Sequence, residues 1–176
     1  IAFNYYNTAT IEAFSESEAA TKGDQQLTLG EPGFFKGVAN EFLPFTDFGW
    51  QIDPLGFRTT MMEIYSRYHL PLLITENGLG AYDKVEEDGS INDDYRIEYL
   101  RQHISELKRA VEAGVEVMGY CPWSAIDLIS THQGFLKRYG FIYVNRDNDD
   151  LKDLKRLKKK SFFWYNNLIK ENADSL

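Results

Sequence analysis

Residues 70–78 read LPLLITENG, and this stretch decides the fold. It opens with an apolar run in which polar side chains do not alternate, a pattern typical of a strand buried on both faces of a parallel sheet. The carboxylate Glu76 follows the run after a single threonine. The stretch therefore predicts a buried strand over Leu70–Ile74 with an acidic group at its carboxyl end.

Two further apolar runs predict strands of the same kind, Ile1–Tyr6 and Val115–Tyr120. Each is followed by polar or glycine-rich residues. The carboxyl ends of parallel strands open on one face, where active sites are built. Tyr6, Glu76 and Ser130 are therefore expected to converge on one place.

Helical patterns separate these strands. An apolar stripe at spacings of three and four predicts an amphipathic helix before the third strand, with Asp93 and Asp94 at its start and Gly114 at its C-cap. A shorter helix is predicted over Leu55–Tyr68, and a final one begins with Ser161 as N-cap. The alternation of strands and helices indicates an α/β architecture. The stripe consists of Ile97, Leu100, Ile104, Leu107 and Val111.

The segment Asn7–Asp47 fits no regular pattern. It is rich in glycine and acidic residues. We expect an extended loop with one helical turn at most, and loops of this length inside compact domains are usually functional.

The composition is that of a folded, acidic protein. The 176 residues are 43% hydrophobic, enough to bury a core, and a formal net charge of −8 argues against a nucleic-acid partner. No apolar run approaches the roughly 20 residues of a membrane helix, so no membrane association is expected. Cys121 is the single cysteine and is expected to be buried and unreactive. With no signal-peptide pattern at the start, the expected location is cytoplasmic.

At four places the chain resembles the family 1 glycoside hydrolases. Ile74–Gly78 matches the nucleophile motif of the family, and Asn4–Tyr6 resembles its sixth barrel strand. Trp50–Pro54 resembles the segment entering the following helix, and Trp123–Asp127 resembles the sugar-binding segment after strand eight. The segments occur in family order along the chain. The resemblance implies a (β/α)8 TIM barrel, of which residues 1–176 form the C-terminal portion, about strands six to eight and their helices.

The family resemblance implies roles for three residues. In a retaining glycosidase one carboxylate attacks the anomeric carbon, and a second carboxyl group protonates the leaving oxygen. The resemblance assigns the nucleophile to Glu76 and the phenol that steadies it to Tyr6. Trp123 is expected to stack on a sugar ring. The alternatives for Glu76 are a salt-bridged buried carboxylate or a helix N-cap. The alternative for the aromatic residues is core packing, with Tyr5 as the inward residue instead of Tyr6.

One part of the family's machinery does not occur in this sequence. The acid/base motif, Thr-x-Asn-Glu-Pro after strand four, is absent from residues 1–176. Three strands also fall short of the eight that close a barrel. We therefore expect the acid/base half to lie outside this chain and the chain alone to be inactive. Open strand edges pair readily with another chain, so self-association is expected.

A departure from the common family pattern indicates a phosphorylated substrate. Ser130 stands where most β-glucosidases of the family have a glutamate, and Lys137 and Tyr139 follow it. A carboxylate would repel a phosphate, whereas a hydroxyl donates to it and a lysine neutralises it. The trio resembles the phosphate-binding signature of 6-phospho-β-glycosidases. Thr131, where phosphogalactosidases tend to have tryptophan, indicates a glucoside.

These residues together predict hydrolysis of 6-phospho-β-D-glucosides, such as phosphorylated cellobiose or aryl glucosides, to glucose 6-phosphate through a covalent glycosyl–Glu76 intermediate. The resemblance implies that a phosphotransferase uptake system makes the substrate. No metal or organic cofactor is expected, because the histidines and the cysteine have no ligand spacing. Two alternatives stay open: an unphosphorylated β-glucosidase in which Lys137 serves another purpose, and a non-catalytic phosphosugar-binding module.

Overall fold

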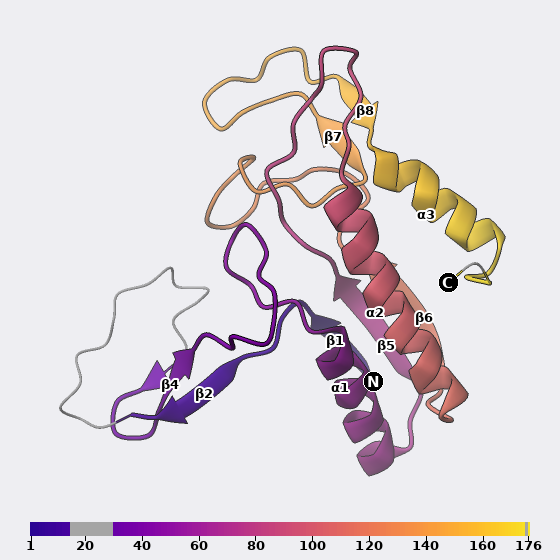
Figure 1. The fold of residues 1–176 in the computed structure, drawn as a ribbon. Coiled ribbons are helices and arrows are strands. Elements are labelled where there is room, and N and C mark those ends of the chain that lie inside the picture. The colour runs from indigo at the N-terminus through magenta and orange to yellow at the C-terminus, as the bar shows by residue number, and fades with distance from the viewer. Residues whose placement is uncertain (15–29, 175) are drawn as a thin grey trace.

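Residues 1–14, 30–174 and 176 are described in the computed structural model, and they centre on a parallel sheet. Three strands are hydrogen-bonded in the order β1–β5–β6, and helical crossovers join them, as in βαβ units (Figure 1). The predicted α/β architecture is confirmed. The described strands form an open sheet and not a closed barrel. They are β1 (Ala2–Tyr5), β5 (Leu72–Asn77) and β6 (Val117–Pro122).

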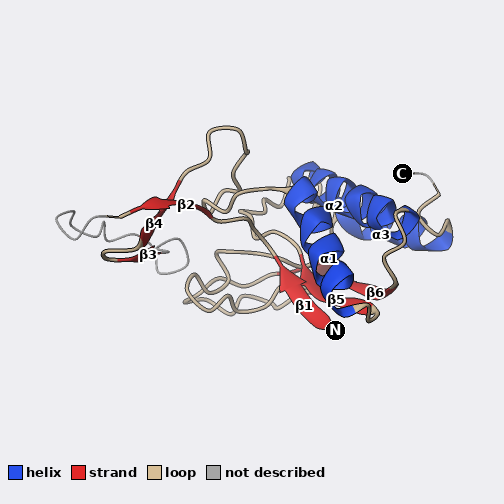
Figure 2. Cartoon of the chain, turned by 90° about the horizontal axis from the view of Figure 1, so that it is seen from below, coloured by secondary structure: helices blue, strands red, loops and turns tan. Residues whose placement is uncertain are grey.

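The three helices of the described chain lie on one side of this sheet (Figure 2). The first begins where Asp53 accepts a hydrogen bond from the Gly56 N–H at 2.8 Å, with proline in the first turn. The second is followed by Gly114, whose φ of 97° is the conformation expected after a helix end. A loop follows the carboxyl end of each of the three parallel strands. The helices are α1 (Pro54–Tyr68), α2 (Asp94–Glu112) and α3 (Lys160–Lys170).

An apolar core joins the first helix to the sheet. Phe57 of α1 packs with Leu72 and Ile74 of β5, and all three side chains are fully buried at 0% exposure. Burying one such side chain contributes about 1.5–3 kcal/mol. Tyr5 belongs to the same core cluster, whereas Tyr6 does not. Tyr5 is therefore the core aromatic, and Tyr6 remains available to the site.

The segment between β1 and α1 is more regular than predicted. An antiparallel sheet in the order β2–β4–β3 occupies part of Asn7–Asp47 and projects away from the parallel sheet (Figure 1). No helix is found in the described part of this segment, and residues 15–29 lie outside the described residues. The expected loop was wrong because the strands are short, and because β2 pairs with β4, which lies more than twenty residues further along the chain. The strands are β2 (Thr10–Ala13), β3 (Gly30–Glu31) and β4 (Phe35–Val38).

Three local predictions need correction. Glu76 lies inside β5, near its end, and not after it. The N-cap of α3 is Lys159 and not Ser161. The Ser161 hydroxyl does not cap the helix because it donates to Asp93 at 2.5 Å, and the Ser161 N–H donates to the same carboxylate at 2.8 Å. Cys121 is exposed, since it lies in β6, which pairs on one side only among the described strands.

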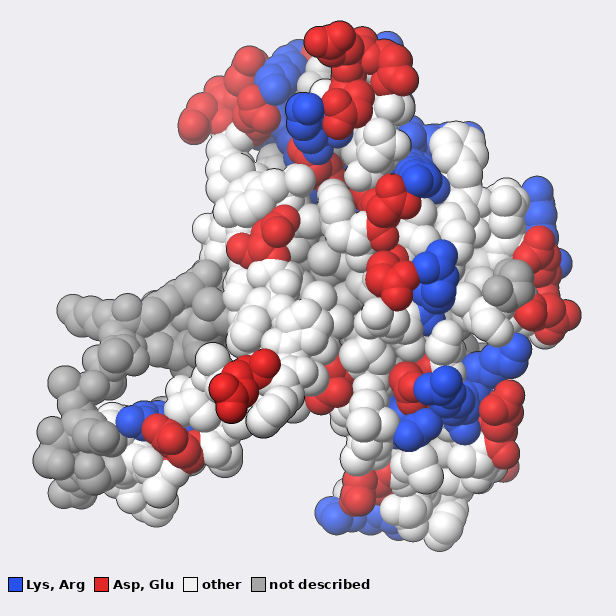
Figure 3. Space-filling view, viewed as in Figure 1, with Lys and Arg blue, Asp and Glu red and all other residues white. Residues whose placement is uncertain are grey.

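Charged side chains of both signs lie close together on the molecular face in Figure 3. Some of them form exposed ion pairs, such as Lys160 with Asp94 at 2.7 Å. Pairs of this kind contribute about 0–1 kcal/mol. In the described ranges, no helix is both long and apolar enough to cross a membrane. The informative charges of this protein are the buried ones described below.

Candidate active site

Glu76 and Tyr6 meet at the carboxyl end of the sheet. The register of β1 and β5 sets Asn4 opposite Glu76, and Tyr6 follows β1 directly. The Tyr6 hydroxyl donates a hydrogen bond to Glu76 Oε2 at 2.6 Å. Burial, together with the Glu76 carboxylate, raises the pKa of Tyr6. The phenol therefore keeps its proton and stays a donor toward Glu76.

The residue after Glu76 fixes the surrounding strands. Asn77 is fully buried; its side-chain NH₂ donates to the Tyr99 hydroxyl at 3.1 Å, and its Oδ1 accepts from the Tyr120 hydroxyl at 2.6 Å. Tyr99 in turn donates to the Tyr6 carbonyl at 3.2 Å. Fully satisfied buried networks favour a single arrangement. This network restrains the backbone on both sides of the Tyr6–Glu76 pair.

Trp50 connects this pair to the segment around Lys137. The Trp50 ring meets the Tyr6 ring edge-on with centroids 5.3 Å apart and lies 6.5 Å from the Tyr139 ring. The Lys137 Nζ stands 3.6 Å from the Trp50 centroid, within cation–π range. In the sequence, Trp50 stands out only as part of a segment that resembles the family. Its role was missed because its partners come from distant parts of the chain.

Ser130, Lys137 and Tyr139 are all buried, Lys137 completely. The pKa of Tyr139 is raised to about 12, chiefly by burial; a hydrogen bond with the Ser130 side chain opposes this rise, and the charge of Glu76 adds to it. The Lys137 Nζ lies 5.5 Å from the Tyr139 ring centroid. Within the predicted trio, Tyr139 therefore contacts both Ser130 and Lys137, and its pKa is affected by the charge of Glu76.

Trp123 and Thr131 occupy different surroundings. Trp123 follows β6 directly and is partly exposed, and its N–H donates to the Asn77 carbonyl at 2.8 Å. This places its backbone beside the residue that follows Glu76. Thr131 is exposed, as is His132. The backbone of Trp123 is thus held next to β5, the strand that contains Glu76, whereas the side chain of Thr131 faces solvent.

The segment 137–139 presents alternate side chains to opposite sides, as extended chains do. Lys137 and Tyr139 lie against Trp50. Arg138 points the other way, and its Nη1 donates to Asp127 Oδ2 at 3.0 Å. Anchoring Arg138 therefore orients its two neighbours toward Trp50.

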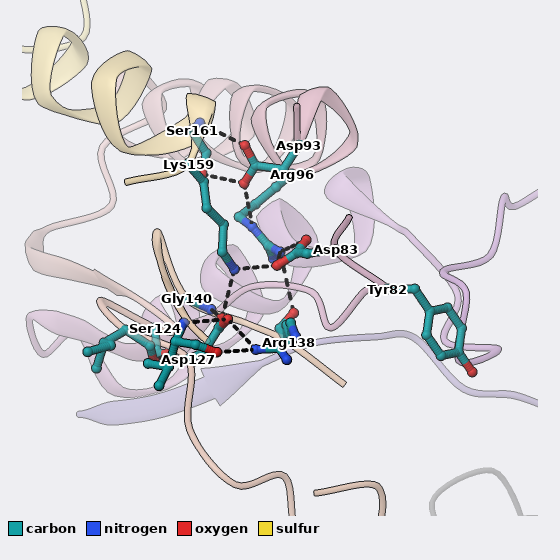
Figure 4. Close-up of polar contacts among 12 residues, drawn as sticks. Tyr82, Asp83, Asp93, Arg96, Ser124, Asp127, Arg138, Gly140, Lys159 and Ser161 are labelled. Atoms are coloured by element: carbon teal, nitrogen blue, oxygen red, sulfur yellow. Dashed lines mark hydrogen bonds and ion pairs between the residues drawn. The ribbon is translucent and has the colours of Figure 1, made fainter. Parts of the chain in front are cut away.

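A buried network of ions holds this anchor (Figure 4). Lys159 lies between two carboxylates: its Nζ donates to Asp127 Oδ1 at 2.7 Å and pairs with Asp83. Burial would raise the pKa of Asp83, but Arg96 and Lys159 outweigh it, so the pKa is lowered. Burial lowers the pKa of Lys159. The network balances Asp83, Asp93 and Asp127 against Arg96, Arg138 and Lys159.

This network was not predicted from the sequence. Its members come from the loop after β5, from α2, from the loop after β6 and from the residue before α3. No spacing along the chain relates them.

As for metals, the described part of the chain has no group of three or more His, Cys, Asp or Glu side chains arranged to hold one.

Comparisons with known proteins identify the family to which this chain is similar. The model of glycosyl hydrolase family 1 matches residues 1–174. An aryl-phospho-β-D-glucosidase of Bacillus subtilis (strain 168) is 50% identical over 184 residues, covering 100% of this chain and 38% of that protein. A phospho-cellobiase of Klebsiella oxytoca is 48% identical over 177 residues, covering 100% of this chain and 36% of the relative. The chain thus spans little more than a third of the length of these relatives.

A solved structure is similar over nearly the whole chain. A family 1 β-glucosidase from Thermotoga maritima superposes with a TM-score of 0.81 at 32% identity. The match covers 97% of this chain and 34% of the solved one. The open sheet and its helices therefore have the same arrangement as part of a larger enzyme.

Proposed function

Because the chain belongs to glycosyl hydrolase family 1, we propose that it forms part of an enzyme that hydrolyses 6-phospho-β-D-glucosides with retention of configuration. The names of the similar aryl-phospho-β-D-glucosidase and phospho-cellobiase support this substrate class. The observation that carries the proposal is the contact of Trp50 with both Tyr6, the partner of Glu76, and Lys137.

Family 1 β-glucosidases have a TIM-barrel fold, and the chain matches only part of it. We assign residues 1–176 to the C-terminal portion of a single barrel, about strands six to eight. The complete barrel, here called the full-length enzyme, supplies the acid/base carboxyl group. Residues 1–176 alone are then expected to lack turnover.

In the proposed mechanism Glu76 is the nucleophile. Its carboxylate attacks the anomeric carbon, the bond to the leaving oxygen breaks, and the acid/base group protonates that oxygen. Tyr6 donates to Oε2, and Oε1 is therefore proposed as the attacking oxygen. Water then attacks the anomeric carbon of the glycosyl–Glu76 ester and gives a proton to the acid/base carboxylate, which restores both carboxyl groups and releases glucose 6-phosphate. The two inversions retain the configuration. Trp123 is assigned to stacking on the sugar.

Lys137 is proposed to neutralise the phosphate while Ser130 and Tyr139 donate hydrogen bonds to it. In the structure the Lys137 ammonium stands against Trp50, an attraction of about 0.5–2 kcal/mol. A hydrogen bond between charged groups is worth about 1.5–3 kcal/mol.

Replacing Lys137 by alanine tests the phosphate site. We expect the ratio of kcat/KM on a 6-phosphorylated aryl β-glucoside to that on the neutral glucoside to fall about ten- to hundredfold. Arg156→Ala, which removes an exposed cation elsewhere, is the control and is expected to leave the ratio unchanged. An unchanged ratio in Lys137→Ala would favour an unphosphorylated β-glucosidase.

Self-association of the isolated chain is also expected. Among the described strands, β1 and β6 each pair only with β5, so each leaves one edge open. Met118 in β6 is 74% exposed, which adds apolar surface beside that edge. Light scattering on residues 1–176 should show dimers or larger species, whereas a monodisperse monomer would argue against this.

Tight binding of glucose 6-phosphate by this chain alone would favour the alternative function, a phosphosugar-binding module.

A further inference from the structure

We propose that Gly80 is a positioning residue for substrate specificity, because the lack of a side chain at this position makes room for the buried Lys137. The inference rests on the proposed function, in which Lys137 binds the sugar phosphate. Gly80 is buried and lies in the loop that follows β5. Its neighbour across the site is the stem of Lys137.

A methyl group on Gly80 would need the space that the Lys137 stem occupies. A Cβ at this position would lie 2.4 Å from Cγ, 2.5 Å from Cε and 3.0 Å from Cδ of Lys137. Carbon atoms in favourable contact are about 3.5–4.0 Å apart. The φ angle of Gly80 is not among the positive ones, so the backbone itself does not demand glycine. The requirement for glycine is therefore one of space for Lys137.

Neither partner can retreat without losing other contacts. Ala81 and Arg138, the residues after Gly80 and Lys137, exchange two backbone hydrogen bonds of 3.0 Å, which fixes the separation of the two segments. The Lys137 side chain is fully buried, and its ammonium stands 3.6 Å from the Trp50 centroid. A stem pushed aside by a methyl group would carry the ammonium away from its place.

The expected consequence is a loss of discrimination for the phosphate. A displacement of about 1 Å in a positioned group can cost about 100-fold in rate. The neutral glucoside makes no use of the ammonium in the proposed function. Gly80→Ala in the full-length enzyme should therefore lower the ratio of kcat/KM for the phosphorylated to the neutral aryl β-glucoside by about 10- to 100-fold.

A double-mutant cycle identifies Lys137 as the residue through which Gly80 acts. In the Lys137→Ala background the stem is gone, so adding Gly80→Ala should change the ratio by less than about twofold. Gly119→Ala is the matched control, since its Cβ would meet only Leu73 Cδ1 at 3.1 Å, and it should keep the wild-type ratio. If Gly80→Ala fails to fold, folding of the double variant supports the inference, and failure of both overturns it.

The outcomes separate this inference from the proposed function. A wild-type enzyme without preference for the phosphorylated substrate contradicts the proposed function and, with it, the role of Gly80. A wild-type preference that Lys137→Ala abolishes but Gly80→Ala preserves leaves the proposed function standing and overturns the inference alone. Equal effects of Gly80→Ala in both backgrounds also overturn it, because the methyl group would then act independently of Lys137.

Discussion

Replacement of Glu76 by alanine is expected to lower kcat of the full-length enzyme on aryl 6-phospho-β-glucosides by about 10⁴- to 10⁶-fold, the scale seen when another hydrolase loses a member of its covalent catalytic machinery. The reason is that the first step of the proposed mechanism then has no nucleophile. Steady-state kinetics with a chromogenic aryl substrate measures this loss. Glu112→Ala, at the exposed end of α2, is the control and should keep full activity.

Rescue with azide distinguishes a nucleophile from a structural carboxylate. In Glu76→Ala, azide can attack the anomeric carbon from the side that the carboxylate has vacated, while the aryl oxide leaves. The product should be the α-glycosyl azide, formed by a single inversion. A variant that retains activity within about tenfold, or one whose rate azide leaves unchanged, contradicts the role of Glu76.

Replacement of Lys159 by methionine is expected to lower the free energy of unfolding by about 3–5 kcal/mol. The change leaves the carboxylates of Asp83 and Asp127 buried without the ammonium that lies between them (Figure 4). Burying a charge whose partner has been removed costs more than losing an exposed pair. Urea denaturation of the full-length enzyme, followed by circular dichroism, measures the difference.

The neighbouring lysine provides a matched control. Lys160 pairs with Asp94, and the two side chains are 52% and 66% exposed. Lys160→Met removes the same charge from the next position along the chain, and it should cost less than about 1 kcal/mol. Equal destabilisation by the two variants would show that the buried network contributes no more than a surface ion pair.

The elements of the fold that were predicted are those whose apolar pattern lies within a single continuous stretch of sequence. The apolar run ending at Ile74 lies in a strand of the parallel sheet, although that strand begins later and runs on through Glu76. Of the predicted helical stripe, Ile97, Leu100 and Ile104 are buried in α2, whereas Val111 at its end is 47% exposed. Such patterns can be recognised in the sequence because the spacing of apolar residues along one element indicates which of its faces is buried. The short strands Thr10–Ala13 and Phe35–Val38 were missed because each depends on pairing with the other.

The site was predictable in part for the same reason. The motif around Glu76 and the trio ending at Tyr139 are local in sequence, and family resemblance pointed to both. The contact between Trp50 and Lys137 and the space left by Gly80 exist only after folding. A tryptophan or a glycine in a loop has many ordinary explanations, so neither residue stands out before its neighbours are known.

The most direct test of the proposed function is kcat/KM of the full-length enzyme on two aryl β-glucosides that differ only in a 6-phosphate. With Ser130, Lys137 and Tyr139 binding the phosphate, we expect the phosphorylated substrate to be preferred by about tenfold or more. Equal or reversed preference would contradict the assignment of these residues to a phosphate site, while leaving membership of the hydrolase family intact.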